Sequence, residues 1–188
     1  MTEEIRMNEF SDKELLEKFL DENTRHYAFN LLVKQYQKRL YWHVRRILLE
    51  HDDSNDVIQN VFIKVWNNLA NFRGDSQLFT WLYRIATNEA ITFLKQKKRR
   101  AFVSFSDLEY EMASGLDNDV LFNGDQIQKK LQEAILKLPT QQRLVFNMKY
   151  FDGMKYEEIG KILDLSIGGL KATYHHAVKK ITKYLTNN

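Results

Sequence analysis

Apolar side chains recur at helical spacing along most of this 188-residue chain. In residues 27–49 and 54–70 they return at steps of three and four, which places them on one side of an α-helix. The pattern is lost after residue 100 and resumes at Ile127. The predicted helices cover residues 11–20, 27–49, 54–70, 78–100, 127–138, 141–151, 156–163 and 167–185.

Capping and turn residues set the expected helix ends. The first helix opens with a Ser-x-x-Glu capping box. The polar residues 51–56 are expected to form a turn, with Ser54 or Asn55 as the cap of the third helix. Pro139 is expected to end the helix before it, because proline disfavours helical geometry in the preceding residue. Further N-cap candidates are Ser76, Thr140 and Ser166.

Composition favours an all-α fold. The chain has one proline and seven glycines, so long helices run uninterrupted and β-hairpin signals are scarce. It has no cysteine, which excludes disulfides, thiolate zinc sites and cysteine nucleophiles, and suits a reducing compartment. The first ten residues are acidic and lack the apolar region of a signal peptide, and no stretch approaches the ~18 apolar residues of a membrane span. We therefore expect a cytoplasmic protein.

Charge is distributed in alternating blocks. Residues 1–24 carry a net charge of −5, residues 25–100 carry +8, residues 101–126 carry −6 and residues 127–188 carry +6. Basic blocks favour polyanions such as nucleic acid. The acidic block has no lysine or arginine, and we interpret it as a linker, either an ordinary solvated one or one that lies along a positive channel. The expected architecture is two small helical domains, 1–100 and 127–188, joined by this acidic linker.

Residues 71–100 combine aromatic and basic side chains. They begin as a loop with one glycine, Gly74, and continue as a helix that ends in a run of lysines and arginines. On a helical wheel at about 100° per residue, an apolar side faces a core and the Arg84 side faces a partner. Rings that stack on bases and cations that bind phosphates suit single-stranded nucleic acid. The alternative is that the rings are core and the charge run is a solvated helix end. The wheel places Thr80, Thr87, Asn88, Lys95 and Lys98 on the Arg84 side.

The last two predicted helices are separated by residues 164–166, and so short a turn predicts a helix-turn-helix. The apolar face of the final helix is expected to hold Leu170, Tyr174, Ala177, Val178, Ile181 and Leu185. Small residues near its start let a helix enter a major groove, and longer cationic residues reach phosphates. The alternative is an ordinary amphipathic helix with a solvated lysine face. The outward residues include Gly168, Gly169, Ala172, His175, His176, Lys179, Lys180 and Lys183, with Lys171 and Thr173 at the margins.

Two segments carry longer patterns. Residues 56–94 read DVIQNVFIKVWNNLANFRGDSQLFTWLYRIATNEAITFL, and residues 138–181 read LPTQQRLVFNMKYFDGMKYEEIGKILDLSIGGLKATYHHAVKKI. In this order they resemble the sigma factors of bacterial RNA polymerase, of the small two-domain extracytoplasmic-function (ECF) type. The resemblance extends from Phe10 to Leu185 and implies a non-enzymatic factor. It would bind core RNA polymerase and direct promoter recognition, DNA opening and transcription initiation.

The resemblance implies a role for each surface of the first domain. The helix over 54–70 would dock on the clamp of the polymerase's largest subunit. The loop after it would capture a flipped base of the minus-ten promoter element, and the next helix would contact DNA as it opens. The implied polymerase-binding residues are Asp56, Gln59, Asn60, Phe62 and Trp66. The implied minus-ten residues are Asn71, Phe72, Arg73, Gly74, Ser76, Phe79, Arg84, Thr87, Asn88 and Lys95.

For the second domain, the resemblance implies binding to the polymerase flap and to the minus-thirty-five element. The implied contact residues are Ser166, Gly168, Gly169, Lys171, Ala172, Thr173, His175, His176 and Lys179. Here the chain departs from the family, because residues 167–173 read IGGLKAT where members commonly show VGTVKSR. Bidentate arginine readout of guanine is therefore absent at that place. An anti-sigma partner, commonly membrane-anchored in this family, is also expected, and the acidic linker would enter the polymerase's positive channel.

Two other classes of function compete with this one. A helix-turn-helix regulator would bind duplex DNA without polymerase, but it leaves residues 71–100 without a task. The sequence gives no support for an enzymatic function, since the chain has no phosphate-binding loop and no acid–base pair at meaningful spacing. The adjacent His175 and His176 diverge by about 100° on a helix, which suits a shared metal poorly. No metal or cofactor is expected.

Overall fold

The structure, a computed structural model, describes residues 10–101 and 126–187. These residues form helices and turns with no strand among them, which confirms the all-α prediction. The predicted linker lies almost wholly outside the described residues. The helices are α1 (Asp12–Leu20), α2 (Arg25–Leu48), α3 (His51–Asn68), η1 (Leu69–Asn71), α4 (Leu78–Ala101), α6 (Gln126–Leu136), α7 (Thr140–Tyr150), α8 (Tyr156–Leu163) and α9 (Ile167–Asn187).

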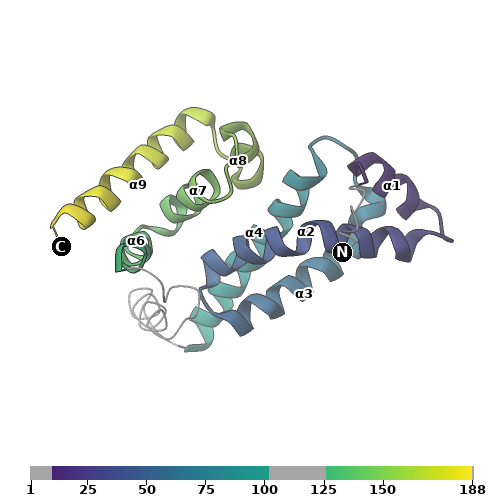
Figure 1. The fold of residues 1–188 in the computed structure, drawn as a ribbon, viewed down its shortest axis with the longest axis horizontal. Coiled ribbons are helices and arrows are strands. Elements are labelled where there is room, and N and C mark those ends of the chain that lie inside the picture. Colours follow the sequence, from purple (N-terminus) through teal and green to yellow (C-terminus); the bar gives the residue numbers. More distant parts are fainter. Residues whose placement is uncertain (1–9, 102–125, 188) are drawn as a thin grey trace, which may run out of the picture.

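The helices α1 to α4 form an N-terminal bundle (Figure 1). The long helices α2, α3 and α4 pack against one another, and their apolar stripes supply fully buried side chains such as Leu40, Val61 and Leu82. The short helix α1 packs on α2, where the Phe19 ring meets the Trp66 ring edge-on with centroids 5.3 Å apart. Burial of this kind, at roughly 25 cal/mol per Å² of apolar surface, drives the bundle together.

One predicted helix start and one predicted helix cap in this bundle are wrong. The capping box of α1 is present, but α3 begins at His51, so residues 51–56 form its first turns instead of a separate turn. The acidic side chains there favour the positive end of the helix dipole, and the buried Ser54 hydroxyl donates to the Glu50 carbonyl. In α4 the first backbone bond runs from Trp81 N to Gln77 O, which places the cap at Gln77 and not at Ser76.

The helices α6 to α9 form a C-terminal bundle with α9 packed across α6, α7 and α8 (Figure 1). As predicted, α6 ends ahead of Pro139, at Leu136. The predicted cap is wrong, because α7 begins at Thr140 and Pro139 is its N-cap residue. The turn between α8 and α9 has the three residues that the sequence predicted. Asp164 adopts a left-handed conformation with φ 56°, and Ser166 Oγ accepts from the Gly169 amide at 3.2 Å. This bundle therefore contains a capped helix-turn-helix.

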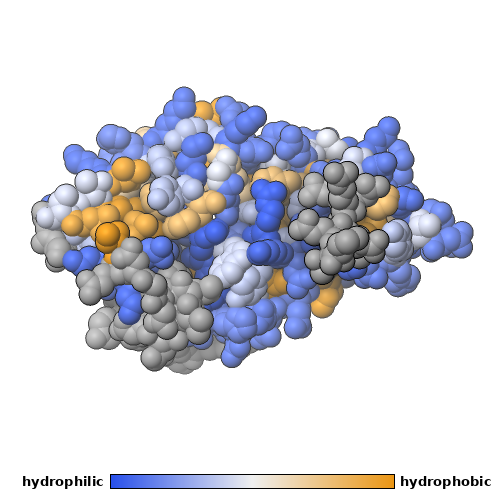
Figure 2. Space-filling view, viewed as in Figure 1, coloured by the Kyte–Doolittle hydropathy of each residue, from blue (hydrophilic) through white to orange (hydrophobic). Residues whose placement is uncertain are grey.

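The two bundles touch along two seams, α4 against α8 and α2 against α7. The face in Figure 2 is mostly hydrophilic, and apolar colour gathers over the C-terminal bundle. There, Val178 and Leu185 are each 37% exposed. Within the described residues, no helix combines the length and the apolar character that a membrane crossing needs.

Close packing in the helix-turn-helix yields a stability prediction at Gly160. A Cβ at this position would lie 2.9 Å from the Leu165 carbonyl oxygen, which is backbone and cannot move aside cheaply. Gly160→Ala is expected to lower the free energy of unfolding by about 1–3 kcal/mol, as overpacking does. The matched control is Gly168→Ala, where a Cβ meets no atom within 4 Å. We expect that change to stay within about 1 kcal/mol, in the stabilising direction. Denaturant unfolding checks both, and equal effects at the two glycines would contradict the packing argument.

Candidate nucleic-acid interface

The loop between α3 and α4 presents its predicted base-binding residues to solvent. Asn71, Arg73 and Gly74 are exposed, and Gly74 has φ 76°, a left-handed conformation that favours glycine. The ring of Phe72 is anchored against that of Trp81, with centroids 5.4 Å apart. The loop therefore combines a fixed aromatic floor with accessible polar groups, as a pocket for a flipped base requires.

Phe79 extends this aromatic surface along α4. It is half-buried, with its ring centroid 4.3 Å from that of Tyr83 and 4.6 Å from the Arg39 guanidinium carbon. Burial raises the pKa of Tyr83, and the Asp152 charge adds to that shift, so the hydroxyl stays neutral. Phe79 is thus held between a cation and a neutral buried ring. Ser76, also predicted to contact DNA, lies three positions before Phe79 and is half-buried.

The predicted Arg84 face of α4 is only partly exposed. Arg84 and Asn88 reach solvent, but Thr80 and Thr87 are 3% and 0% exposed. The wheel was therefore wrong to place both threonines on an outward surface. The physical reason is a wider contact with α2 than the apolar spacing indicates, since Thr87 Oγ1 lies 2.9 Å from Nε2 of the buried His43.

The basic run at the end of α4 is divided between structure and surface. Lys97 Nζ lies 2.7 Å from Asp53 Oδ2 and ties the end of α4 to the start of α3. Lys95 and Arg99 are exposed and accessible to phosphates. The side chain of Lys98 lies outside the described part of the chain. The exposed strip of α4 therefore leads from the loop to two cations.

The outward face of α9 is open along its length. On its predicted apolar face, Leu170, Ala177 and Ile181 are buried, so the predicted orientation of the helix holds at these positions. The prediction is wrong for Val178 and Leu185, which are each 37% exposed. Only Thr173 of the predicted contact set is half-buried. The exposed members are Ser166, Gly168, Gly169, Lys171, Ala172, His175, His176 and Lys179.

A shallow apolar groove of about 480 Å³ lies between α2 and α3. Its walls include Phe62 and Trp66, two of the predicted polymerase-binding residues, and the side chain of Ile63 is 59% exposed on it. Gln59 also lines the groove. Sequence analysis missed Ile63, although an apolar residue off the buried stripe of α3 was a usable signal. The remaining predicted residues of this surface, Asp56 and Asn60, are exposed.

A polar cluster between the two bundles was also missed. Asp152, in the turn after α7, has Oδ2 3.0 Å from His43 Nδ1 and Oδ1 2.6 Å from Arg46 Nη1. The side chains of His43 and Asp152 are only 1% and 5% exposed. A second polar contact lies on the other seam, between α4 and α8, where Arg84 Nε donates to the Lys161 carbonyl at 2.8 Å. These partners are more than 70 positions apart, and no local pattern predicts such pairs.

Residues 10–101 and 126–187 contain no candidate metal site. No group of three or more histidine, aspartate or glutamate side chains there could hold an ion. The ring centroids of His175 and His176, neighbours on α9, lie 6.0 Å apart, and the ring planes make an angle of 66°. The surfaces described above are built from aromatic, apolar, amide and cationic groups.

Comparison with known proteins assigns both bundles. Residues 32–100 match the family model for sigma-70 region 2, and residues 128–181 match that for sigma-70 region 4. The RNA polymerase sigma-H factor of Pseudomonas aeruginosa is 32% identical over 184 residues, which cover 93% of each chain. The ECF RNA polymerase sigma-E factor of Escherichia coli is 34% identical over 162 residues, or 82% of this chain and 84% of that protein.

Solved structures show the same fold. CnrH in complex with the cytosolic domain of CnrY has a TM-score of 0.68 at 22% identity, covering 94% of this chain and 98% of CnrH. The sigma factor RpoE in complex with the anti-sigma factor NepR, from Bartonella quintana, has a TM-score of 0.66 at 19% identity, covering 84% and 96%. The chain therefore belongs to the sigma-70 family of RNA polymerase sigma factors, in its ECF group, whose members bind core RNA polymerase and direct it to promoters.

Proposed function

We propose that this sigma factor docks on core RNA polymerase through the α2–α3 groove and holds promoter DNA with the α3–α4 loop, α4 and α9. Polymerase supplies the chemistry of transcription, and the sigma factor supplies position and sequence selection. The proposal assigns no reaction to the chain itself. Because polymerase and DNA are its partners, we place the protein in the cytoplasm.

The exposed apolar groove is the observation that carries the docking proposal. Apolar patches rimmed by polar residues mark protein–protein contacts, and Ile63 stands 59% exposed beside the exposed Gln59 and Asn60. The groove is also stiff. Trp66 packs edge-on against Phe29 with ring centroids 5.0 Å apart, which limits the entropy lost on binding. The clamp of the largest polymerase subunit is the partner we propose for it.

The minus-ten proposal rests on the aromatic, amide and cationic side chains found between the α3–α4 loop and the end of α4. A base that leaves its stack costs a few kcal/mol and needs a ring or pocket in compensation. Phe72 and Phe79 supply rings, Asn88 supplies amide hydrogen bonds, and Lys95 supplies positive charge for the phosphates. Asn88 and Lys95, seven residues apart, share one exposed side of α4.

The minus-thirty-five proposal assigns α9 to the major groove of duplex DNA. Gly168, Gly169 and Ala172 give its first turns a low profile, and Lys171 and Lys179 are exposed for phosphates. With no arginine on this helix, recognition depends more on phosphate contacts and DNA shape than on guanine readout. We expect strong salt dependence for that reason.

We also propose an anti-sigma factor as a regulatory partner. CnrH and RpoE, which share this fold, are each solved with a second protein, CnrY and the anti-sigma factor NepR. A partner of this kind would compete with polymerase for the apolar groove on α2 and α3. It needs an apolar segment to fill the space beside Ile63.

The docking proposal predicts a large effect of charge in the groove. Ile63→Asp places a carboxylate on the exposed apolar surface and is expected to weaken core-polymerase binding at least tenfold, since it would be desolvated in the complex. Because Ile63 is exposed in the free protein, this substitution should leave the free energy of unfolding nearly unchanged. The control is Ile127→Asp on α6, the same substitution at a 70% exposed position outside the groove. Binding to purified core polymerase is the measurement, and equal affinity of the two variants would rule out the groove.

The minus-ten proposal predicts a defect in DNA opening at Asn88. Asn88→Ala removes exposed amide groups and is expected to slow promoter opening roughly tenfold, matching the ~1–3 kcal/mol of a good base contact. Core binding should not change, because Asn88 lies outside the groove. Asn30→Ala, another exposed asparagine on α2, is the matched control. Permanganate reactivity of unpaired thymines reports opening, and a loss of core binding by Asn88→Ala would contradict the assignment.

A further inference from the structure

We propose that duplex DNA binding by α9 is coupled to protonation of His175 and His176, so that the contact strengthens as the pH falls. Each imidazole takes up a proton from solvent when a DNA phosphate comes to lie beside it. This coupling rests on the proposed function of α9, since it requires DNA on that helix. It adds to the permanent lysine contacts two contacts whose charge depends on the pH.

The two histidines lie among the lysines of the outward face. Every lysine of α9 is exposed, and so are His175 and His176. Residues four positions apart are neighbours on a helix surface. His175 therefore lies between Lys171 and Lys179, and His176 lies one turn before Lys180. Both rings belong to the surface that the proposed duplex contact covers.

Histidine is the side chain whose charge ordinarily changes between about pH 5 and 8. A neutral imidazole offers one N–H donor and one acceptor, whereas a protonated one offers two donors and a positive charge. A phosphate carries negative charge and accepts hydrogen bonds, so it binds the protonated ring more tightly than the neutral ring. A partner that prefers the protonated form also favours proton uptake, because the two equilibria are linked.

No anion of α9 itself stabilises a protonated ring in the free protein. The segment Ile167–Asn187 contains no aspartate or glutamate. Neither histidine forms a hydrogen bond or an ion pair with any residue that the structure describes, and their rings contact each other with centroids 6.0 Å apart. Burial raises the pKa of Tyr174, the residue before His175, so its hydroxyl stays neutral in this range. The phosphates of DNA are then the anions that meet the two rings.

The elements packed against α9 do not alter this conclusion. On α6, Glu133 accepts from the Tyr184 hydroxyl at 2.8 Å. On α8, Glu158 accepts from the Lys155 amide at 2.7 Å. After α7, the Asp152 carboxylate is already bound in the polar cluster described above. The other charged side chains of α6, α7, α8 and the turn before α9 are Lys129, Lys130, Arg143, Lys149, Glu157, Lys161 and Asp164.

The coupling distinguishes the two proposed DNA surfaces. The predicted minus-ten residues include no histidine, and their cations are arginine and lysine, which stay charged throughout this pH range. The chain's other histidines, His26, His43 and His51, belong to the N-terminal bundle and to neither predicted contact set. A fall in pH therefore strengthens the distal contact and leaves the charges of the minus-ten surface unchanged.

The pH dependence of duplex binding by the full chain tests the coupling. The probe is a pool of short duplexes of random sequence at constant ionic strength. From about pH 8 to about pH 6, wild-type affinity is expected to rise at least fivefold, since each imidazole that gains a proton contributes a few-fold. The double variant His175→Gln/His176→Gln keeps polar groups that do not titrate, and we expect less than about a twofold change. His175→Lys/His176→Lys carries permanent charge, so its affinity should be equally insensitive to pH.

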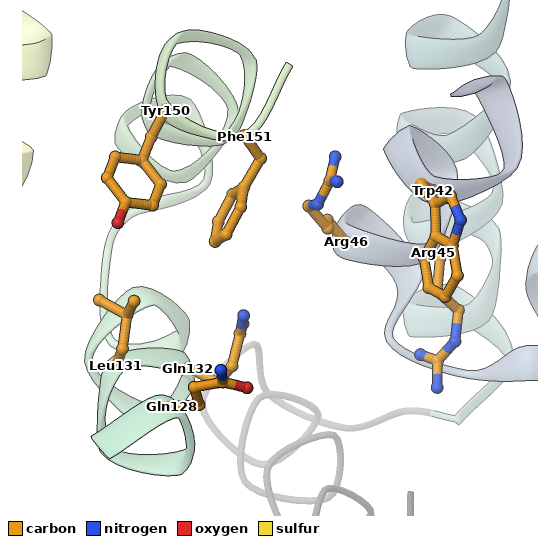
Figure 3. Close-up of a pocket in the computed structure, with 8 residues that line it drawn as sticks. All are labelled: Trp42, Arg45, Arg46, Gln128, Leu131, Gln132, Tyr150 and Phe151. Atoms are coloured by element: carbon orange, nitrogen blue, oxygen red, sulfur yellow. The ribbon is translucent and has the colours of Figure 1, made fainter. Parts of the chain in front are cut away.

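Gln128→His is the matched control, because it adds an exposed imidazole to the same bundle away from α9. Figure 3 shows Gln128 on α6, where it lines a cavity of about 370 Å³ that faces α2. We expect this variant to keep the wild-type pH profile.

The salt dependence of the same binding provides a second measurement. Each phosphate contact adds about 0.9 to the slope of log affinity against log salt concentration. The wild-type slope should therefore be steeper at the lower pH by up to about 2, while the slope of the glutamine variant should be the same at both pH values.

A wild-type pH dependence that persists in His175→Gln/His176→Gln overturns the coupling, as do equal wild-type salt slopes at the two pH values. Lys171→Ala/Lys179→Ala, measured at about pH 8, reports separately on the proposed function, because it removes only permanent charges. Unchanged affinity of this lysine variant would contradict duplex binding by α9, and the coupling with it. Weaker binding by the lysine variant, together with an unaltered pH profile in the glutamine variant, would reject the coupling alone.

Discussion

The packing of α4 is the constraint on which the rest of the molecule depends. Its apolar side packs against α2 and α3, and Leu78, Leu82 and Ala86 on that side are each at most 1% exposed. Small side chains at Ala86 and Ala90 let the neighbouring helices approach closely. The opposite flank is in turn contacted by α8. What α4 can offer to DNA is therefore limited to a narrow strip, and the C-terminal bundle has access to part of that strip.

The same division recurs on α3 and α9. Each has one apolar face that builds a core and a second face whose composition suits a partner: apolar and amide on α3, small and cationic on α9. Because the core faces fix the helices, the outward faces are presented rigidly. On the proposed assignment, a sigma factor of this size combines a polymerase contact and two DNA contacts on elements that are also its scaffold.

Much of this could be predicted from the sequence, because its signals are local. Helical spacing, the proline before α7 and the short capped turn before α9 are set by neighbouring residues, and they identified the helices and the helix-turn-helix. The start of α3 was misjudged because its polar residues resemble a turn, while in the structure the acidic ones stabilise an exposed helix N-terminus. The burial of Thr87 and the polar cluster around Asp152 could not be predicted in this way. Their environment comes from residues far away in the chain, and one sequence gives no local trace of those contacts.

Transcription from a library of promoter sequences by core RNA polymerase with this protein tests the central claim most directly. We predict that the transcribed templates share two short sequence elements upstream of the start site, at one preferred spacing set by the two bundles. Changes in α9 should alter only the distal element. Transcripts that match those of core polymerase alone, with no enriched element, would contradict the assignment of these surfaces to promoter recognition.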